Sequence, residues 1–161
     1  MLARIYREPE PAADGEPEIR VRSMGWRESM PPGMLHYPQG LPRWLLIFFH
    51  DEVHAGSSPE DSVRAPSGLF IWPPGSQQRY GNPETGWTHS WLQFSGKDVP
   101  TALAEAKLPV AAMLRLPGAD GRVDVYFRRF FEERSLHAEP HPGVLRHLLY
   151  HFAELGGILD F

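Results

Sequence analysis

Residues 66–96, PSGLFIWPPGSQQRYGNPETGWTHSWLQFSG, decide the fold of this chain, because strand and turn signals alternate within them. Residues 69–72 are a short apolar run, and the Pro-Pro-Gly of 73–75 ends that run as a tight turn. Residues 87–94 then alternate between the two faces of a half-buried strand. The stretch therefore predicts two strands of a β-barrel, joined by a turn and a polar, aromatic rim.

One face of the second strand carries the side chains that a small-molecule site needs. His89, Trp91 and Gln93 share that face, because successive side chains of a strand point to opposite sides. An aromatic ring can cover the C–H face of a polar ligand while the flanking polar groups fix its hydroxyls. Sugars and related polyols fit that description.

The same stretch resembles the N-terminal sensor domain of AraC-type transcription regulators, which is a cupin-like barrel. The resemblance rests on an apolar strand at 44–49, Pro-Pro-Gly at 73–75, Arg79-Tyr80-Gly81, then Trp87, His89 and Trp91, and finally Phe94-Ser95-Gly96. It covers residues 35–96 well and the rest of the chain in general layout. It implies a mainly β fold, a jelly-roll barrel followed by two antiparallel C-terminal α-helices.

Composition and charge narrow the class of protein. The chain has 161 residues, 42% hydrophobic and 22% charged, which suits one domain with a buried core. A net charge of −4 speaks against a surface that binds nucleic acid by itself. The lack of cysteine excludes disulfides, Cys-ligated zinc and thiol catalysis. With no apolar run long enough for a signal peptide or membrane helix, we expect a soluble, cytoplasmic protein.

The chain is organised with β signals first and helical periodicity last. Residues 8–18, EPEPAADGEPE, combine proline, glycine and acids, so residues 1–18 are expected to form a flexible arm. That arm is either a disordered tail or, as the resemblance implies, a segment that folds over a bound ligand. Residues 19–118 are expected to form the barrel and residues 119–161 the helical pair.

Within the barrel segment, alternation predicts a first strand at 19–24, and prolines and glycines break 31–42 into loops. The apolar run at 44–49 predicts a strand buried on both faces, one toward the barrel interior and one against helices or a partner. Residues 51–66 read as a hairpin loop with a return strand near 62–64. Residues 97–107 read as a short helix with Leu103 facing inward.

From Gly121 the hydrophobic period becomes helical. The first helix has one apolar stripe, made of Val123, Phe127, Phe130 and Phe131. A second helix begins at Pro142 and ends at Gly156-Gly157, and its stripe consists of Leu145, Leu148, Leu149, Phe152 and Leu155. The two helices are expected to pack antiparallel. Their stripes either cover the barrel only or also form a homodimer contact, as the resemblance implies.

A metal site is the main alternative to a sugar-binding site, because many cupins are metalloenzymes with histidine ligands before and after the Pro-x-Gly turn. The position of the later histidine is Gln78 here, and a neutral amide is a poor ligand for a transition metal. His50 and His54 would lie roughly 13 Å apart on one strand, too far to chelate one ion. We expect both to be solvated residues at a strand end, and no metal or cofactor.

Other catalytic motifs are missing from the sequence. No phosphate loop, nucleophile elbow or His-Glu-x-x-His motif occurs. Ser90 follows His89, but adjacent strand residues point to opposite faces and cannot form a nucleophile–base pair. His147 and His151 have the i, i+4 spacing of helical metal ligands without a visible third ligand. We therefore expect no catalytic residues and no enzyme activity.

The resemblance assigns ligand binding to Tyr80, His89 and Trp91, at positions that bind sugar in the family. Trp91 would stack on the ligand, His89 would exchange one hydrogen bond with it, and Tyr80 would close the rim through its hydroxyl. For Tyr80 and Trp91 the alternative is ordinary core packing.

Three further residues complete the expected site. Gln93 shares the face of Trp91, and Trp44 is expected in the apolar wall. Tyr37 stands before Pro38, where the family has an arginine. Losing a guanidinium removes a multi-donor clamp for hydroxyls, so arabinose is disfavoured, and the tyrosine adds a second stacking surface.

Three functions follow, in order of preference: the ligand-sensing domain of an AraC-type regulator, a stand-alone sugar-binding cupin, and a metal-dependent cupin enzyme. In the first, the chain is a sensor fragment, the effector is a carbohydrate, and DNA is bound only by a helix-turn-helix domain outside this chain. Ligand binding would order the acidic arm or shift the helical pair, and so change how two DNA-binding domains are presented.

Overall fold

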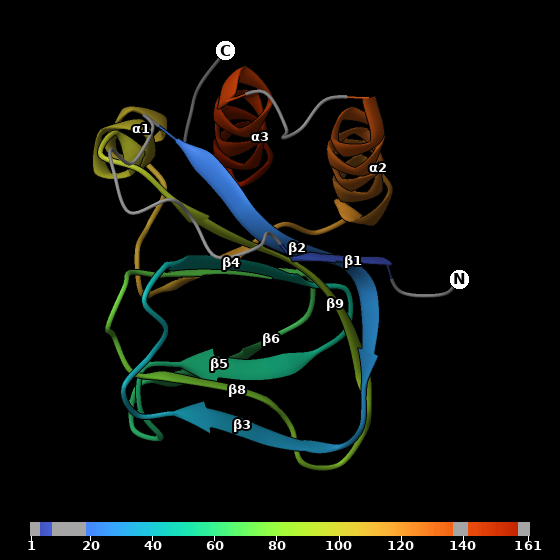
Figure 1. Ribbon diagram of the computed structural model, residues 1–161. Helices are drawn as coiled ribbons and strands as arrows, with labels where there is room; N and C mark the ends of the chain where they lie inside the picture. Colours follow the sequence, from blue (N-terminus) through green and yellow to red (C-terminus); the bar gives the residue numbers. More distant parts are fainter. Residues whose placement is uncertain (1–3, 8–18, 137–141, 158–161) are drawn as a thin grey trace.

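The computed structural model describes residues 4–7, 19–136 and 142–157, and these residues form three layers. Three helices cover one face of a six-stranded sheet, and a four-stranded sheet lies against its other face (Figure 1). Both sheets are built from antiparallel pairs. The mainly β fold with C-terminal helices was therefore predicted correctly in outline.

The elements follow one another along the chain with short connections. The strands are β1 (Arg4–Arg7), β2 (Arg20–Met30), β3 (Gly33–Tyr37), β4 (Trp44–Phe49), β5 (Val53–Gly56), β6 (Ser62–Ala65), β7 (Gly68–Trp72), β8 (Gln78–Asn82), β9 (Trp87–Ser95) and β10 (Met113–Arg115). The helices are α1 (Val99–Ala106), α2 (Asp120–Leu136) and α3 (Pro142–Leu155).

The strands do not close into a barrel. The larger sheet has the order β1-β2-β9-β4-β7-β10, and the smaller sheet has the order β3-β8-β5-β6. No ladder of paired strands joins the two sheets within the described residues. The expected closed barrel is thus corrected to an open sandwich, in which side chains rather than backbone hydrogen bonds fill the space between the sheets.

Two hydrophobic cores lie on the two faces of the larger sheet, and β4 contributes to both. Leu45, Ile47 and Phe49 face the smaller sheet, whereas Leu46 and Phe48 face the helices. Successive strand residues alternate between faces, so a continuous apolar run is what a strand between two layers requires. The prediction of a strand buried on both faces is confirmed.

The helices form where their periodicity predicted. Val123, Phe127 and Phe130 of α2 are at most 1% exposed, and Leu145, Leu148 and Phe152 of α3 are buried in the same core. Gly157 follows α3 with a φ of 71°, a left-handed conformation that favours glycine after a helix. The expected fold counts two C-terminal helices, whereas the described residues form three. The additional helix, α1, lies where residues 97–107 predict a short helix with Leu103 inward, and Leu103 is 2% exposed.

Several strands lie where the sequence predicted loops. The polar, aromatic rim after the Pro-Pro-Gly turn contains β8, and the proline-rich stretch 31–42 contains β3, which pairs with β8. The expected hairpin loop at 51–66 contains β5, which also pairs with β8. Within the expected arm, Arg4–Arg7 forms β1 and pairs with β2. Residues 8–18, on which the arm hypothesis depends, lie outside the described residues. None of the described helices combines the length and apolar character that crossing a membrane requires.

Candidate functional site

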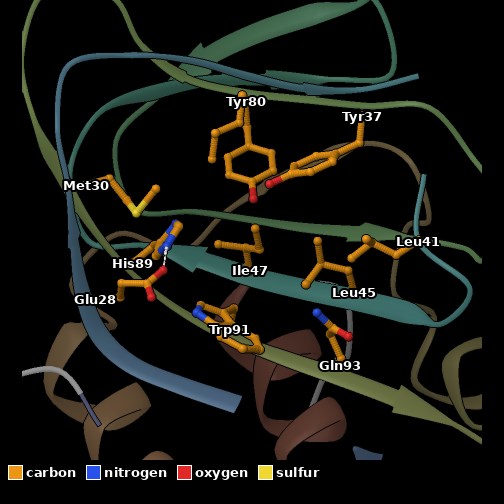
Figure 2. A pocket seen from close by; sticks show the side chains of 11 residues that line it. Glu28, Met30, Tyr37, Leu41, Leu45, Ile47, Tyr80, His89, Trp91 and Gln93 are labelled. Carbon is orange, nitrogen blue, oxygen red and sulfur yellow. Dashed lines mark hydrogen bonds and ion pairs between the residues drawn. The ribbon is translucent and has the colours of Figure 1, made fainter. Parts of the chain in front are cut away.

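A cavity of about 260 Å³ lies between the two sheets, and it contains most of the predicted site (Figure 2). Strands of both sheets and the loop before β4 contribute to its wall. Its lining consists of Glu28, Met30, Leu35, Tyr37, Leu41, Leu45, Ile47, Tyr80, His89, Trp91 and Gln93. Aromatic rings, aliphatic side chains and a few polar groups thus meet in a space that suits a ligand of monosaccharide size.

The structure brings together five of the six predicted binding residues. Tyr37 and Tyr80 enter the cavity from the smaller sheet, and the alternate residues of β9, namely His89, Trp91 and Gln93, enter from the larger one. Trp44 does not line this cavity. It packs on Phe94 at a ring distance of 6.4 Å and joins the core beneath the helices, because Leu45 and Ile47 take the inner face of β4.

His89 has both ring nitrogens engaged. The Trp87 indole N–H donates to His89 Nδ1 at 3.2 Å, and His89 Nε2 lies 3.0 Å from Glu28 Oε1. An indole can only donate, so Nδ1 accepts and Nε2 carries the proton that it donates to the carboxylate. His89 was expected to bind the ligand itself. In this arrangement it contacts Glu28, and the carboxylate joins Gln93 as a polar group of this wall.

Glu28 reaches the cavity because of a β-bulge in β2. Gly25 pairs with Trp91 and Glu28 pairs with His89, so Trp26 and Arg27 together oppose the single residue between them on β9. Arg27 takes a positive φ of 53° at this point. In a regular strand Glu28 would face the helices, and the extra residue turns it inward. Sequence reasoning ended this strand at Met24 and missed Glu28, since a bulge leaves no periodic signal.

Gly25 shapes the position of Trp91. A Cβ atom on Gly25 would overlap the indole ring of Trp91 at Nε1 and Cε2. The ring therefore rests on the bare backbone of β2, and it is 6% exposed at the cavity wall. A glycine opposite an aromatic residue lets the ring approach a neighbouring strand closely.

The two tyrosines form the opposite wall. Burial raises the pKa of the Tyr80 hydroxyl above its ordinary value, and the Tyr37 hydroxyl beside it adds to the effect. The ring of Tyr80 also packs on Trp72 at 5.4 Å and Phe49 at 5.8 Å. Tyr80 therefore packs in the core and also lines the cavity. Both roles that the sequence left open for it, core packing and a place in the ligand site, are compatible with this position.

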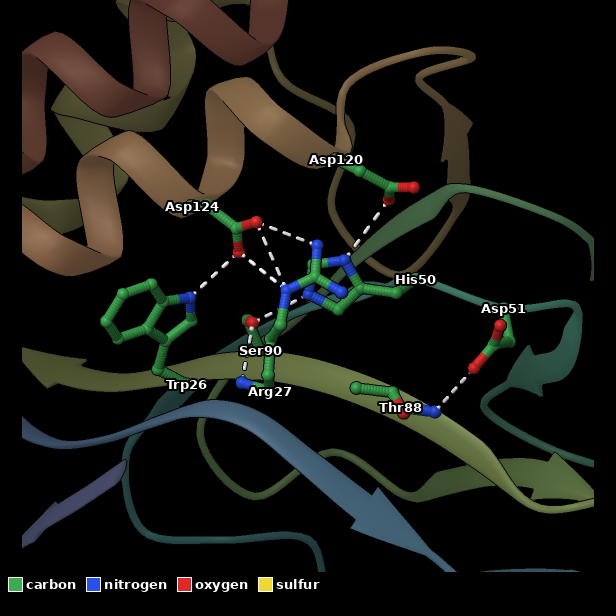
Figure 3. A network of polar contacts seen from close by, with 8 residues as sticks. All are labelled: Trp26, Arg27, His50, Asp51, Thr88, Ser90, Asp120 and Asp124. Atoms are coloured by element: carbon green, nitrogen blue, oxygen red, sulfur yellow. Dashed lines mark hydrogen bonds and ion pairs between the residues drawn. The ribbon is translucent and has the colours of Figure 1, made fainter. Parts of the chain in front are cut away.

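On the far side of the bulge, a polar network links β2 to α2 (Figure 3). Arg27 makes a two-oxygen contact with Asp124, with distances from 2.8 to 3.1 Å, and the Trp26 indole donates to the same carboxylate at 2.8 Å. Burial raises the pKa of Asp124, but the hydrogen bonds from Arg27 and Trp26 outweigh burial and hold the pKa below its ordinary value.

His50 joins the same network, so the expectation of a solvated histidine is wrong. Its side chain is 2% exposed, with Nδ1 3.1 Å from Asp120 and Nε2 2.8 Å from Ser90 Oγ. Burial first, and then the charge of Arg27, lowers the pKa of His50. A neutral His50 donates from Nδ1 to the carboxylate and accepts the Ser90 hydroxyl proton at Nε2.

This Ser-His-Asp order is the one that activates a serine nucleophile in hydrolases. Ser90 is fully buried, and its Oγ also accepts the backbone N–H of Arg27 at 3.1 Å. The three side chains therefore fix the bulge and the start of α2 to β9. The sequence pairs Ser90 only with the adjacent His89. His50 follows the end of β4 and lies 40 residues from Ser90, so no local pattern indicates this contact.

The described residues contain no group of three His, Cys, Asp or Glu side chains placed to hold a metal ion. Gln78, at the position of the later cupin histidine, is fully buried on β8, and neither amide atom has a hydrogen-bond partner within the described part of the chain. The helical pair His147 and His151 contacts the ring of Tyr126 instead of forming a ligand set.

Comparisons with known proteins locate the fold. No protein-family model matches the chain, and no curated protein matches it. Among solved structures, the AraC-like transcriptional activator CuxR is 14% identical, with a TM-score of 0.51 over 98% of this chain and 62% of its own. At that identity the likeness shows a shared fold and nothing further.

Two further solved structures match over shorter segments. The ethanolamine utilization protein EutQ of Salmonella typhimurium is 14% identical over 47% of this chain, with a TM-score of 0.35. A cupin domain from Bordetella pertussis is 15% identical over 52% of this chain and 100% of its own, with a TM-score of 0.34. The match spans 57% of EutQ, so the chain covers less than two thirds of that protein and of CuxR.

Proposed function

We propose that this chain is the small-molecule-sensing domain of an AraC-type transcription regulator, with a sugar or polyol as effector. The observation that carries the proposal is the cavity between the sheets, where Trp91, Tyr37 and Tyr80 surround a space of about 260 Å³ with Glu28 and Gln93 in its wall. Rings of this kind cover the C–H faces of a sugar, and carboxylate and amide groups bond its hydroxyls. Binding is favoured over catalysis, because the Ser90 hydroxyl of the Ser-His-Asp arrangement is fully buried and does not line the cavity.

The bulge in β2 supplies a route from the cavity to the helices. Glu28 faces the ligand space, and the preceding residue, Arg27, holds Asp124 of α2. A ligand that draws the carboxylate away from His89 would rotate the backbone at the bulge and so disturb the Arg27–Asp124 contact. A ligand shifts the equilibrium between the intact and the disturbed Arg27–Asp124 contact only if it binds the two conformations with different affinity. A contact with Glu28 in one conformation and not in the other would provide that difference.

The likeness to CuxR over 98% of this chain supports the regulator over the stand-alone sugar-binding cupin. In the regulator, DNA would be bound by a separate domain. A second copy of the chain is the expected partner, and the effector is a carbohydrate. The stand-alone cupin remains the second candidate, since the cavity would serve both.

Calorimetric titration with neutral monosaccharides and polyols tests the proposal, using matched tryptophan variants. Trp91 lines the cavity, whereas Trp44 lies on the other face of the same sheet. We expect at least one sugar to bind the wild type, Trp44→Ala to retain that binding, and Trp91→Ala to lose it while still melting cooperatively. Binding that survives Trp91→Ala, or no binding across the panel, would refute the proposal.

A further inference from the structure

The outer face of the smaller sheet carries a separate hollow of about 230 Å³, called the outer hollow below. Its lining consists of Met34, His54, Pro59, Ser62, Arg79 and Pro83. On β8, Tyr80 faces the cavity between the sheets, so the adjacent Arg79 points to the opposite side. The same alternation turns His54 of β5 outward, between the buried Val53 and Ala55. The outer hollow thus lies on the layer that is farthest from the helices (Figure 1).

Strand pairing places three polar side chains around Gly56, which has no side chain of its own. Arg79 of β8 pairs with Gly56 on one side, and Ser62 of β6 pairs with it on the other. His54 stands two residues before Gly56 on β5 and shares its face. Because neighbouring strands are about 4.8 Å apart and alternate residues about 6.6 Å, all three backbone positions lie within about 7 Å of Gly56. A guanidinium, an imidazole and a hydroxyl can therefore reach one bound group.

The loop between β5 and β6 forms one wall of the outer hollow. A Cβ atom on Gly56 would overlap the carbonyl oxygen of Asp61, so the glycine lets this loop fold back over β5. The Asp61 N–H donates to the Ser58 carbonyl at 3.2 Å and closes the turn. Pro59 in the loop and Pro83 after β8 line the hollow, and their fixed φ angles restrict the backbone of these walls.

The polar groups of the outer hollow are not used by neighbouring residues. Within the described part of the chain, the side chains of Arg79 and His54 form no ion pair or hydrogen bond. The Ser62 hydroxyl is buried and also has no partner there. By contrast, Arg64 on the same face of the sheet binds Glu52 at 3.2 Å. A buried hydroxyl without a partner is destabilising, so a ligand that supplies an acceptor recovers this cost.

We propose that the outer hollow binds the phosphate group of a small phosphorylated metabolite, such as a sugar phosphate. The Arg79 guanidinium would donate two hydrogen bonds to phosphate oxygens, and His54 and Ser62 would donate one each. No carboxylate lines the hollow to repel the phosphate. Met34 and the two prolines would contact the rest of the ligand. This site is independent of the proposed function, because it lies outside the cavity between the sheets.

Calorimetric titration at constant ionic strength compares three probes: inorganic phosphate, glucose and glucose-6-phosphate. We expect both phosphate compounds to bind, and the sugar phosphate to bind more tightly than inorganic phosphate because of its additional contacts. Equal affinity for the two would overturn the assignment to a metabolite and leave the ion itself as the ligand. No binding of either would overturn the inference.

Arg79→Gln tests the residue, and Arg64→Gln is its matched control on the same face of the sheet. We expect Arg79→Gln to weaken binding of the sugar phosphate about tenfold or more, and Arg64→Gln to leave it within about twofold of the wild type. Equal weakening in both variants would mean that general surface charge attracts the phosphate, and it would overturn the inference.

Ser62→Ala separates a role in binding from a role in folding. Because the Ser62 hydroxyl has no partner among the described residues, we expect this variant to keep the melting temperature of the wild type and to bind the sugar phosphate more weakly. Unchanged affinity would contradict a contact between this hydroxyl and the ligand. None of these outcomes affects the proposed function, whose test uses neutral sugars and Trp91.

Discussion

Gly25 is the residue on which the position of Trp91 depends, because only a bare backbone lets the indole lie across β2. Gly25→Ala should displace the ring and weaken sugar binding by about three- to tenfold, the range expected for one aromatic contact. Calorimetric titration measures this change. Gly121→Ala is the control, since a Cβ atom there meets nothing within 4 Å. Unchanged affinity in Gly25→Ala would show that the ring is not part of the binding surface.

His50 makes stability depend on pH at the same bulge. Its folded pKa lies below the unfolded value of about 6.5. The unfolded chain therefore binds the proton more readily, so the stabilisation is present above pH 6.5 or so and is lost as pH falls through the folded pKa. Arg27, Asp120 and Asp124 are the charged groups that act on this imidazole.

We expect the free energy of unfolding of the wild type to fall below about pH 6.5, by at most about 1.4 kcal/mol per pH unit for this one proton. His50→Gln should flatten that dependence, and His54→Gln, a half-exposed histidine on β5, should not. Denaturant titrations across this pH range measure the slopes. A wild-type slope retained in His50→Gln would assign the titration to another group, such as His151, whose pKa burial also lowers.

At the scale of elements, the contact between β2 and α2 depends on one carboxylate. Asp124→Ala should leave the Trp26 indole and the Arg27 guanidinium without their acceptor. We expect a loss of about 1–3 kcal/mol in the free energy of unfolding, because both donors are partly buried. Arg128→Ala on the exposed side of α2 should change it by less than about 0.5 kcal/mol. Equal losses in both variants would mean that the Asp124 network does not anchor the helix.

The elements that sequence reasoning found are those with a strong local pattern. Local sequence alone indicates which residues are buried in these elements: the apolar run of β4, the alternation of β9, and the apolar stripes of α2 and α3. Three of the strands it missed, β3, β5 and β8, belong with β6 to the smaller sheet. Prolines, glycines and polar residues interrupt the apolar–polar alternation in these strands. The strands form through pairing with strands that are distant in sequence, which local patterns do not indicate.

The candidate site divides in the same way. The inward residues of β9 were predicted because alternation alone assigns them to one face. Trp44 was misplaced, since a strand that is apolar on both faces does not reveal which residues face inward. Glu28 and the His50 network were missed because each depends on a bulge or on contacts between residues at least 40 positions apart.

For the whole molecule, the proposed homodimer would use the face formed by α2 and α3. A hollow there is lined by Arg122, Val125, Tyr126, Arg129, His147 and His151, and Val125 is 64% exposed. We expect light scattering to give the mass of a dimer and Val125→Glu to give a monomer, because a charge on an apolar contact must be desolvated. Val63→Glu, a 42% exposed valine on β6, should remain dimeric. A monomeric wild type, or dissociation by Val63→Glu alone, would refute this arrangement.

If a ligand between the sheets changes the contact of β2 with α2, the five tryptophan indoles of the chain report that change in one experiment. Heteronuclear NMR resolves one indole N–H resonance for each, in protein titrated with the sugar that binds best. We expect shifts for Trp91 in the cavity wall, for Trp87 through His89, and for Trp26 through Asp124. The indole resonances of two other tryptophans should not shift. Trp44 lies on the other face of the sheet, and the Trp72 indole donates a hydrogen bond to the Gly56 carbonyl. A saturating ligand that leaves the Trp91 resonance unshifted would contradict the proposed site. A ligand that shifts Trp91 but not Trp26 would contradict the coupling between the cavity and α2.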